Sequence, residues 1–235
     1  MLERGDVRLL REMISSLLSR FPSLTEFCDR CLRSERWGGS VVLMVVDAAL
    51  TSSGLNYFTI VVPKVRAFAE RVLTRGGVQS LSSLAVIPIE NVRDIWRNER
   101  QWHVARGIAT VLAGIGGDDK EALRRWARAS DPTRMREDPI GSIKGVGPVT
   151  FHYLRAMGGV DTVIPDRVVK KVINNLLAET GRPPSWRDID FIRSVEEVAQ
   201  ITGLRRVELC WLAWLMAGEA EKVSSIKIKE LLSQL

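Results

Sequence analysis

The sequence has few residues that bind metals or form covalent cross-links. Its 235 residues include two histidines and three cysteines, Cys28, Cys31 and Cys210. Three thiols cannot build a disulfide framework, and they are one short of the four thiolates that an iron–sulfur cluster normally needs. We therefore expect no disulfide scaffold, no iron–sulfur cluster and no metal site, and a reducing, cytoplasmic compartment.

Long apolar segments and regular strand patterns are also scarce. The longest apolar segment, residues 209–217, is too short to cross a bilayer, and the first ten residues do not resemble a signal peptide. Lysine and arginine number 34 against 28 aspartates and glutamates, a net charge of +6. An excess of this size suits a nucleic-acid-binding domain but is weak support by itself. We expect no association with a membrane.

Hydrophobic residues make up 46% of the chain, which is enough for a sizeable core. Amphipathic stretches separated by Gly, Pro, Ser and Asp predict an all-α protein. Residues 41–50 are ambiguous because β-branched side chains favour a strand, but no partner strand is evident and we expect a helix. The other helices are expected at about residues 7–20, 24–34, 63–76, 89–98, 101–113, 119–129 and 149–157, from 166 onward, from 194 to 203, and from there to 217.

The most informative segment is residues 143–172. Glycine allows positive φ and leaves the backbone uncovered, so Gly145 to Gly147 predict a tight turn between two short helices. The N–H groups at the start of the second helix, near Val149, would attract an anion such as a phosphate, and Lys144 would add a positive charge. The alternative is a hairpin of two helices that binds no ligand.

Together with its flanks, this turn resembles the hairpin of the helix-hairpin-helix DNA glycosylases, the endonuclease III-like superfamily. An apolar helix ending in two glycines follows the turn, and Asp166 then opens another helix, as in that family. The resemblance covers about residues 38–180. The residues that match the hairpin are Ile143, Gly145, Val146, Gly147 and Thr150.

The resemblance implies two all-α lobes with a DNA-binding cleft between them. Residues 38–142 would form a central lobe, and residues 1–37 plus 143–235 a second one. The hairpin (143–158) and a catalytic loop (159–166) would lie at their interface. Double-stranded DNA with a damaged or mispaired base would be the partner of a monomer, nucleoid-associated in a prokaryote. No cofactor would be required, although a monovalent cation could sit at the hairpin.

The resemblance implies that Asp166 is the catalytic carboxylate. Breaking a base–sugar bond develops positive charge on the sugar, which a nearby carboxylate stabilises. The alternative role is an N-cap, which Asp fills well and which is compatible with catalysis. Asp161 is a rival carboxylate that we assign to a loop. Bifunctional relatives carry a lysine where this chain has Val149, which implies a monofunctional glycosylase.

Other positions are less specific. Ser52 stands where many relatives have a glutamine that fills the gap left by a flipped base, so Asn56 or Tyr57 could supply this wedge instead, or all three could be ordinary loop residues. His152 could contact substrate or be an internal histidine. Arg93, Arg97 and Arg100 share a face of the helix expected at 89–98 and its flank; they could contact phosphates or simply be solvated. The apolar helix with Trp211 and Trp214 is unsuited to reading bases and is expected to be buried.

The first alternative to a catalytic role is a non-catalytic helix-hairpin-helix DNA-binding protein that uses the same turn. A helix-turn-helix regulator is the second alternative, and it would require a dimer with sequence-specific affinity.

Overall fold

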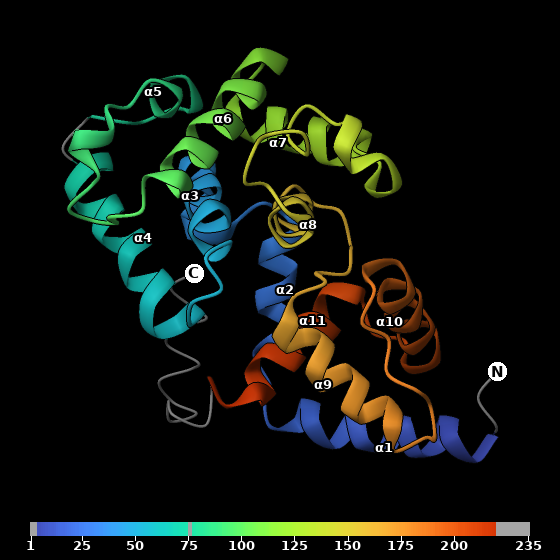
Figure 1. The fold of residues 1–235 in the computed structure, drawn as a ribbon. Helices are drawn as coiled ribbons and strands as arrows, with labels where there is room; N and C mark the ends of the chain where they lie inside the picture. Colours follow the sequence, from blue (N-terminus) through green and yellow to red (C-terminus); the bar gives the residue numbers. More distant parts are fainter. Residues whose placement is uncertain (1–3, 75–76, 220–235) are drawn as a thin grey trace. The chain divides into compact units, whose positions relative to one another are not determined.

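A computed structural model describes residues 4–74 and 77–219 (Figure 1). These residues form α-helices joined by turns and by short 3-10 and π-helical segments, and no β-strand occurs among them, which confirms the all-α class. The α-helices are α1 (Arg4–Ser19), α2 (Leu24–Leu32), α3 (Val41–Thr51), α4 (Val62–Phe68), α5 (Leu81–Ala85), α6 (Glu99–Ile115), α7 (Asp119–Ala129), α8 (Pro148–Met157), α9 (Arg167–Ala178), α10 (Asp188–Thr202) and α11 (Arg206–Trp214).

The chain divides into two compact units. Among the described residues, a central unit comprises residues 30–74 and 77–160, and a terminal unit combines residues 4–29 with residues 161–219. The sequence analysis placed the division at 37/38 and 142/143, whereas the units of the structure meet at 29/30 and 160/161. The glycine hairpin therefore belongs to the central unit, and Asp166 belongs to the terminal unit.

Helix α3 forms the core of the central unit. All of its residues are buried, and it packs against α4, α6 and α8 (Figure 1). A helix that is apolar on every side is stable only when other elements cover it completely. This environment explains why a segment rich in valine folds as the helix that we expected at residues 41–50.

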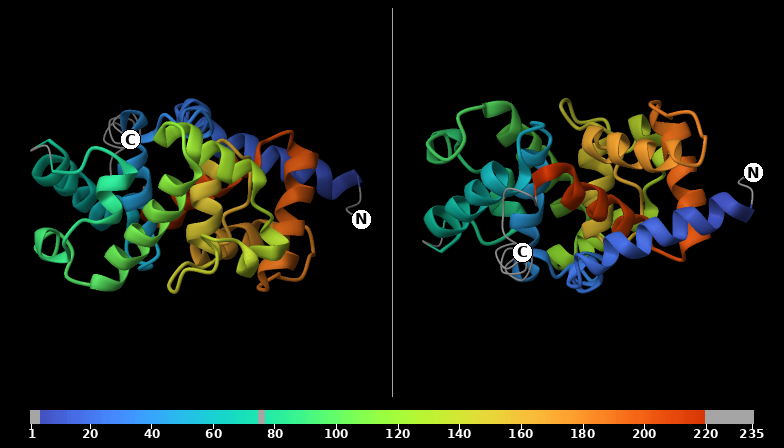
Figure 2. Two further views of the ribbon diagram at one scale, coloured as in Figure 1. Left: turned by 90° about the horizontal axis from the view of Figure 1, so that it is seen from above. Right: turned by 90° about the horizontal axis from the view of Figure 1, so that it is seen from below.

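The terminal unit is built around α11. This helix packs against α9 and α10, and α10 in turn contacts α1, as Figure 2 shows. Trp211 of α11 is fully buried and meets Phe27 edge to face, with ring centroids 4.6 Å apart. The burial expected for this apolar helix is confirmed.

Three helix predictions need correction. Residues 89–98 form only a 3-10 turn at Ile89–Asn91 and further turns, because Asn98 has extended backbone and caps α6. The helix expected to open at Ser194 begins at Asp188. The sequence analysis also missed α5, which begins with a capping box between Ser80 and Ser83. Gly76 and the polar tail beyond residue 219 lie outside the described residues.

Candidate functional site

The glycine hairpin rests on one face of α6. Gly145 has φ +107°, and a Cβ added to it would lie 2.8 Å from Val104 Cγ2 and 3.2 Å from Arg100 Nε. A Cβ on Gly107 would lie 3.2 Å from Ile143 Cγ2. Arg100, Val104 and Gly107 follow one another at spacings of four and three residues, which places them on one side of the helix. Both the positive φ and the lack of space require glycine at position 145.

The segment that leads into the hairpin differs from the short helix expected there. Residues Pro132–Glu137 form a 3-10 helix, and turns follow up to residue 145. The Asp138 carboxylate holds these turns by accepting the N–H groups of Ile140 (2.7 Å) and Gly141 (3.0 Å). It also accepts the Trp126 indole N–H at 3.1 Å. The hairpin is therefore entered from a fixed turn rather than from a regular α-helix.

The start of α8 leaves backbone donors uncovered. Gly147 is its N-cap, with extended backbone (φ −108°, ψ 177°), and no side chain caps this end. Within the described residues, the N–H groups of Gly147, Val149 and Thr150 have no acceptor; the first bond runs from the Phe151 N–H to the Gly147 carbonyl (3.0 Å). Uncovered N–H groups and the helix dipole together favour an anion at this end.

Gly147 is not required by its backbone angle, contrary to the argument from the sequence. Its φ is open to any residue, and no atom lies within 4 Å of an added Cβ. What glycine provides here is open space beside the helix end. The same helix end carries the Thr150 hydroxyl, which is buried with no hydrogen-bond partner among the described residues.

The remaining hairpin residues divide between surface and interior. Lys144 is exposed, and Val149 is half-buried. Val146 is buried and anchors the turn, which its N–H closes by bonding to the Ile143 carbonyl at 2.9 Å. The Lys144 charge and the amides of α8 are thus the features that a ligand could reach. The monovalent cation expected at the hairpin stays a prediction.

Asp166 is the N-cap of α9, and only one of its oxygens is used. Oδ1 accepts the Val168 N–H at 2.7 Å and the Trp214 indole N–H at 3.1 Å. Oδ2 has no hydrogen bond within the described part of the chain, and the residue is half-buried. Trp214 is almost fully buried and meets Trp211 edge to face at 4.7 Å. The carboxylate is therefore fixed through one oxygen and keeps the other for a ligand.

Asp161 contrasts with Asp166. Its Oδ1 accepts the Val207 N–H (2.9 Å), and its Oδ2 accepts both the N–H (3.1 Å) and the Nη1 group (3.3 Å) of Arg206. Both oxygens thus satisfy donors at the start of α11, whose first N–H groups have no intrahelical partner. Asp161 therefore has a structural role. It differs from Asp166 in that both of its oxygens accept hydrogen bonds.

The residues suggested for a wedge or pocket have structural partners. The Ser52 hydroxyl donates to the Ala49 carbonyl (2.6 Å), and Asn56 Oδ1 accepts the N–H (2.8 Å) and hydroxyl (2.6 Å) of Thr59. His152 is buried in α8, 4% exposed. These contacts give Ser52 and Asn56 structural roles, and burial places His152 in the interior of its unit.

Tyr57 is buried and belongs to a polar cluster around the Asp47 carboxylate. Its hydroxyl donates to Asp47 Oδ2 at 3.0 Å and lies 3.1 Å from the Tyr153 hydroxyl. Burial holds the pKa of both tyrosines well above the ordinary value. In this position Tyr57 cannot act as a surface wedge. The donors to Asp47 are Arg36, Trp37, Thr51, Tyr57 and Tyr153.

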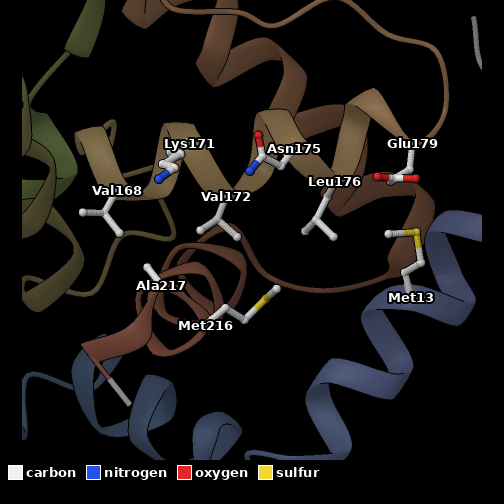
Figure 3. Close-up of a pocket in the computed structure, with 9 residues that line it drawn as sticks. All are labelled: Met13, Val168, Lys171, Val172, Asn175, Leu176, Glu179, Met216 and Ala217. Carbon is white, nitrogen blue, oxygen red and sulfur yellow. The ribbon is translucent and has the colours of Figure 1, made fainter. Parts of the chain in front are cut away.

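A groove of about 460 Å³ runs along α9 within the terminal unit (Figure 3). Val168, Val172 and Leu176 point into it, spaced four residues apart, and Lys171 and Glu179 lie at its edge. The opposite wall comes from Met13, Met216 and Ala217. The sequence analysis missed this groove because its walls come from three distant parts of the chain.

Two further tests concern metals and membranes. Within the described residues, no group of three or more His, Cys, Asp or Glu side chains is placed to hold a metal ion. No helix in the same residues is both long and apolar enough to cross a bilayer. Comparison of the chain with protein-family models, with curated proteins and with solved structures gives no match.

Proposed function

We propose that this protein is a monofunctional DNA glycosylase of base excision repair. It would turn a damaged or mispaired base out of the duplex and hydrolyse the bond between that base and its deoxyribose. The observation that carries the proposal is the state of Asp166, whose Oδ1 is fixed by two donors while Oδ2 has no partner among the residues that the structure describes. The family resemblance of residues 143–172 supplies the reaction.

The chemistry assigned to Asp166 follows from the charge that develops on the sugar. As the base leaves, positive charge spreads over C1′ and the ring oxygen, and a carboxylate at this position lowers the energy of that state. The same oxygen can orient or deprotonate the attacking water. The Val168 and Trp214 donors would hold the carboxylate so that it does not have to reorganise during the reaction.

The α8 end of the hairpin would position the DNA. The uncovered N–H groups of Gly147, Val149 and Thr150 would donate hydrogen bonds to a phosphate oxygen, and Lys144 would add charge. Contacts of this kind bind the DNA backbone whatever its sequence. The damaged base would therefore be recognised after it is turned out of the duplex, and not by the hairpin.

The product would be an intact strand with an abasic site. A strand-cleaving glycosylase forms a Schiff base between a lysine and C1′, and Val149 occupies the position of that lysine. Lys144 lies on the other side of the turn and is exposed, which suits a phosphate contact. We infer that no covalent intermediate forms.

The proposal is tested by measuring base release from duplexes that each carry one lesion: uracil, a mispaired thymine, an alkylated purine or oxidised guanine. We expect wild type to release at least one of these bases, and Asp166→Asn to release none while it still binds a duplex with an abasic-site analogue. Asp161→Asn is the matched control, since it makes the same change at a carboxylate five residues away and should keep the activity.

A specific result favours the non-catalytic alternative. If wild type binds duplex DNA through the hairpin but releases no base from any lesion, the protein is a DNA-binding module. Equal activity of wild type and Asp166→Asn would remove Asp166 from the mechanism.

A further inference from the structure

The Arg100 side chain lies across the glycine turn. Its Nε is 3.2 Å, and its Cγ 3.8 Å, from the point where a Cβ on Gly145 would sit. Arg100 comes from the first turn of α6, whose start is capped by Asn98. Arg100 thus places its guanidinium beside a hairpin that lies about 45 residues later in the sequence.

We propose that Arg100 is a phosphate-binding residue that acts together with the α8 amides, so that a DNA backbone phosphate is held from two elements at once. The inference rests on the DNA-binding half of the proposed function and is independent of Asp166. It assigns a role to one of three arginines that the sequence pattern could not distinguish.

The charge of Arg100 is available to a ligand. Its side chain is exposed, and it has no ion pair or hydrogen bond within the residues that the structure describes. Arg97 is likewise exposed and has no side-chain hydrogen bond or ion pair within the described residues, so its difference from Arg100 is that only Arg100 lies beside Gly145. Two other nearby arginines have partners. Arg93 pairs with Glu99, and Arg106 donates to the Ala85 carbonyl at 3.1 Å. Arg100 is thus distinguished from them both by its position on the hairpin and by its unused donors.

The chemistry of this position suits a phosphate. A guanidinium presents several donors in a planar fork that matches two oxygens of a phosphate, and it stays charged at any physiological pH. The uncovered N–H groups of Gly147 and Val149 supply further donors on the same hairpin. The buried Thr150 hydroxyl, at the same helix end, also has no acceptor among the described residues. These donors are not bonded to any carboxylate among the described residues, so they favour an anion as ligand.

The test is the salt dependence of DNA binding, measured with a duplex that carries an abasic-site analogue over about 50 to 200 mM salt. Loss of one phosphate contact makes the negative slope of log K against log salt shallower by about 0.9. If variant and wild type bind equally at 1 M salt, the variant then binds about eightfold more weakly at 0.1 M. We expect Arg100→Gln to show this shallower slope. We expect Arg100→Lys, which keeps the positive charge, to retain most of the wild-type slope.

Arg93→Gln is the matched control, because it removes the same charge from an arginine already paired with Glu99. We expect its slope to equal that of wild type. Thermal unfolding of all variants, compared with wild type, verifies that the fold is unchanged. An Arg100→Gln slope equal to that of Arg93→Gln would overturn the inference.

The inference and the proposed function can fail separately. An unchanged Arg100→Gln slope, with base release that still depends on Asp166, would overturn only the role of Arg100. A slope that depends on Arg100 in a protein that releases no base would support Arg100 and reject the glycosylase. Wild type that binds no duplex would reject both.

Discussion

At the scale of single residues, hydrogen bonding distinguishes two aspartates that the sequence places five positions apart. Asp161 uses both oxygens to satisfy the start of α11, whereas Asp166 uses one oxygen and leaves the other unengaged. The sequence analysis preferred Asp166 because a helix follows it directly. It could not identify Trp214 as a donor to Asp166, because this contact joins residues 48 positions apart.

Replacing Trp214 by Phe should slow base release while DNA affinity stays constant. Phenylalanine keeps most of the packing but removes the indole N–H that fixes Asp166 Oδ1. A misplaced catalytic group costs on the order of ten- to a hundredfold in rate, which single-turnover base release would measure. Trp102→Phe is the matched control, since that indole N–H binds the Trp96 carbonyl in the central unit. Equal rates for Trp214→Phe and wild type would show that this hydrogen bond does not position the carboxylate.

At the scale of elements, local sequence patterns predicted those helices whose ends carry their own signals. The helix expected at residues 119–129 coincides with α7, which has Asp118 as its N-cap. The helix expected at 89–98 is wrong because Asn98, which would lie inside it, has extended backbone and caps α6 instead. The packing of the hairpin against α6 could not be predicted either, because it depends on Val104 and Gly107 lying close to residues about 40 positions later.

The two hairpin glycines should respond differently to alanine. At Gly145, the positive φ and the nearby Val104 methyl group should lower the free energy of unfolding by about 1–3 kcal/mol. At Gly147, the backbone accepts alanine and the added methyl group meets open space, so stability should be unchanged while duplex binding weakens. Thermal unfolding and binding isotherms measure the two effects. If Gly147→Ala binds duplex DNA as tightly as wild type, the α8 end is not a phosphate site.

At the scale of the whole molecule, both units bury titratable groups that are neutral in the folded state. Burial raises the pKa of Cys210 in the terminal unit from 9.0 to about 12, and nearby Asp161 and Asp166 act in the same direction against the Ile164 N–H. Burial likewise raises the pKa of Tyr57 and Tyr153 in the central unit. The burial of Tyr57 could not be predicted from its position in a loop, because its partners Asp47 and Tyr153 come together with it only in the folded chain.

The protein should therefore lose stability in alkali. A group with a raised pKa binds its proton more tightly in the folded state, so its contribution is complete below the unfolded pKa and falls as pH rises toward the folded value. For Cys210 the loss begins near pH 9.0 and amounts to about 1.4 kcal/mol per pH unit up to about 12. The tyrosines should add to it above pH 10.0.

Urea unfolding at a series of alkaline pH values measures this dependence. Cys210→Ser is the matched control, because its hydroxyl does not titrate in this range, and its unfolding free energy should fall less steeply just above pH 9.0. Identical slopes for the variant and wild type would contradict the assignment to Cys210.

The most direct test of the central proposal is the product formed on a lesion-bearing duplex, examined on a denaturing gel with and without hot alkali. We expect strand cleavage only after alkali, because an abasic site forms without a Schiff base. With wild type, the absence of alkali-labile sites for every lesion would contradict glycosylase activity, and cleavage without alkali would contradict the monofunctional mechanism.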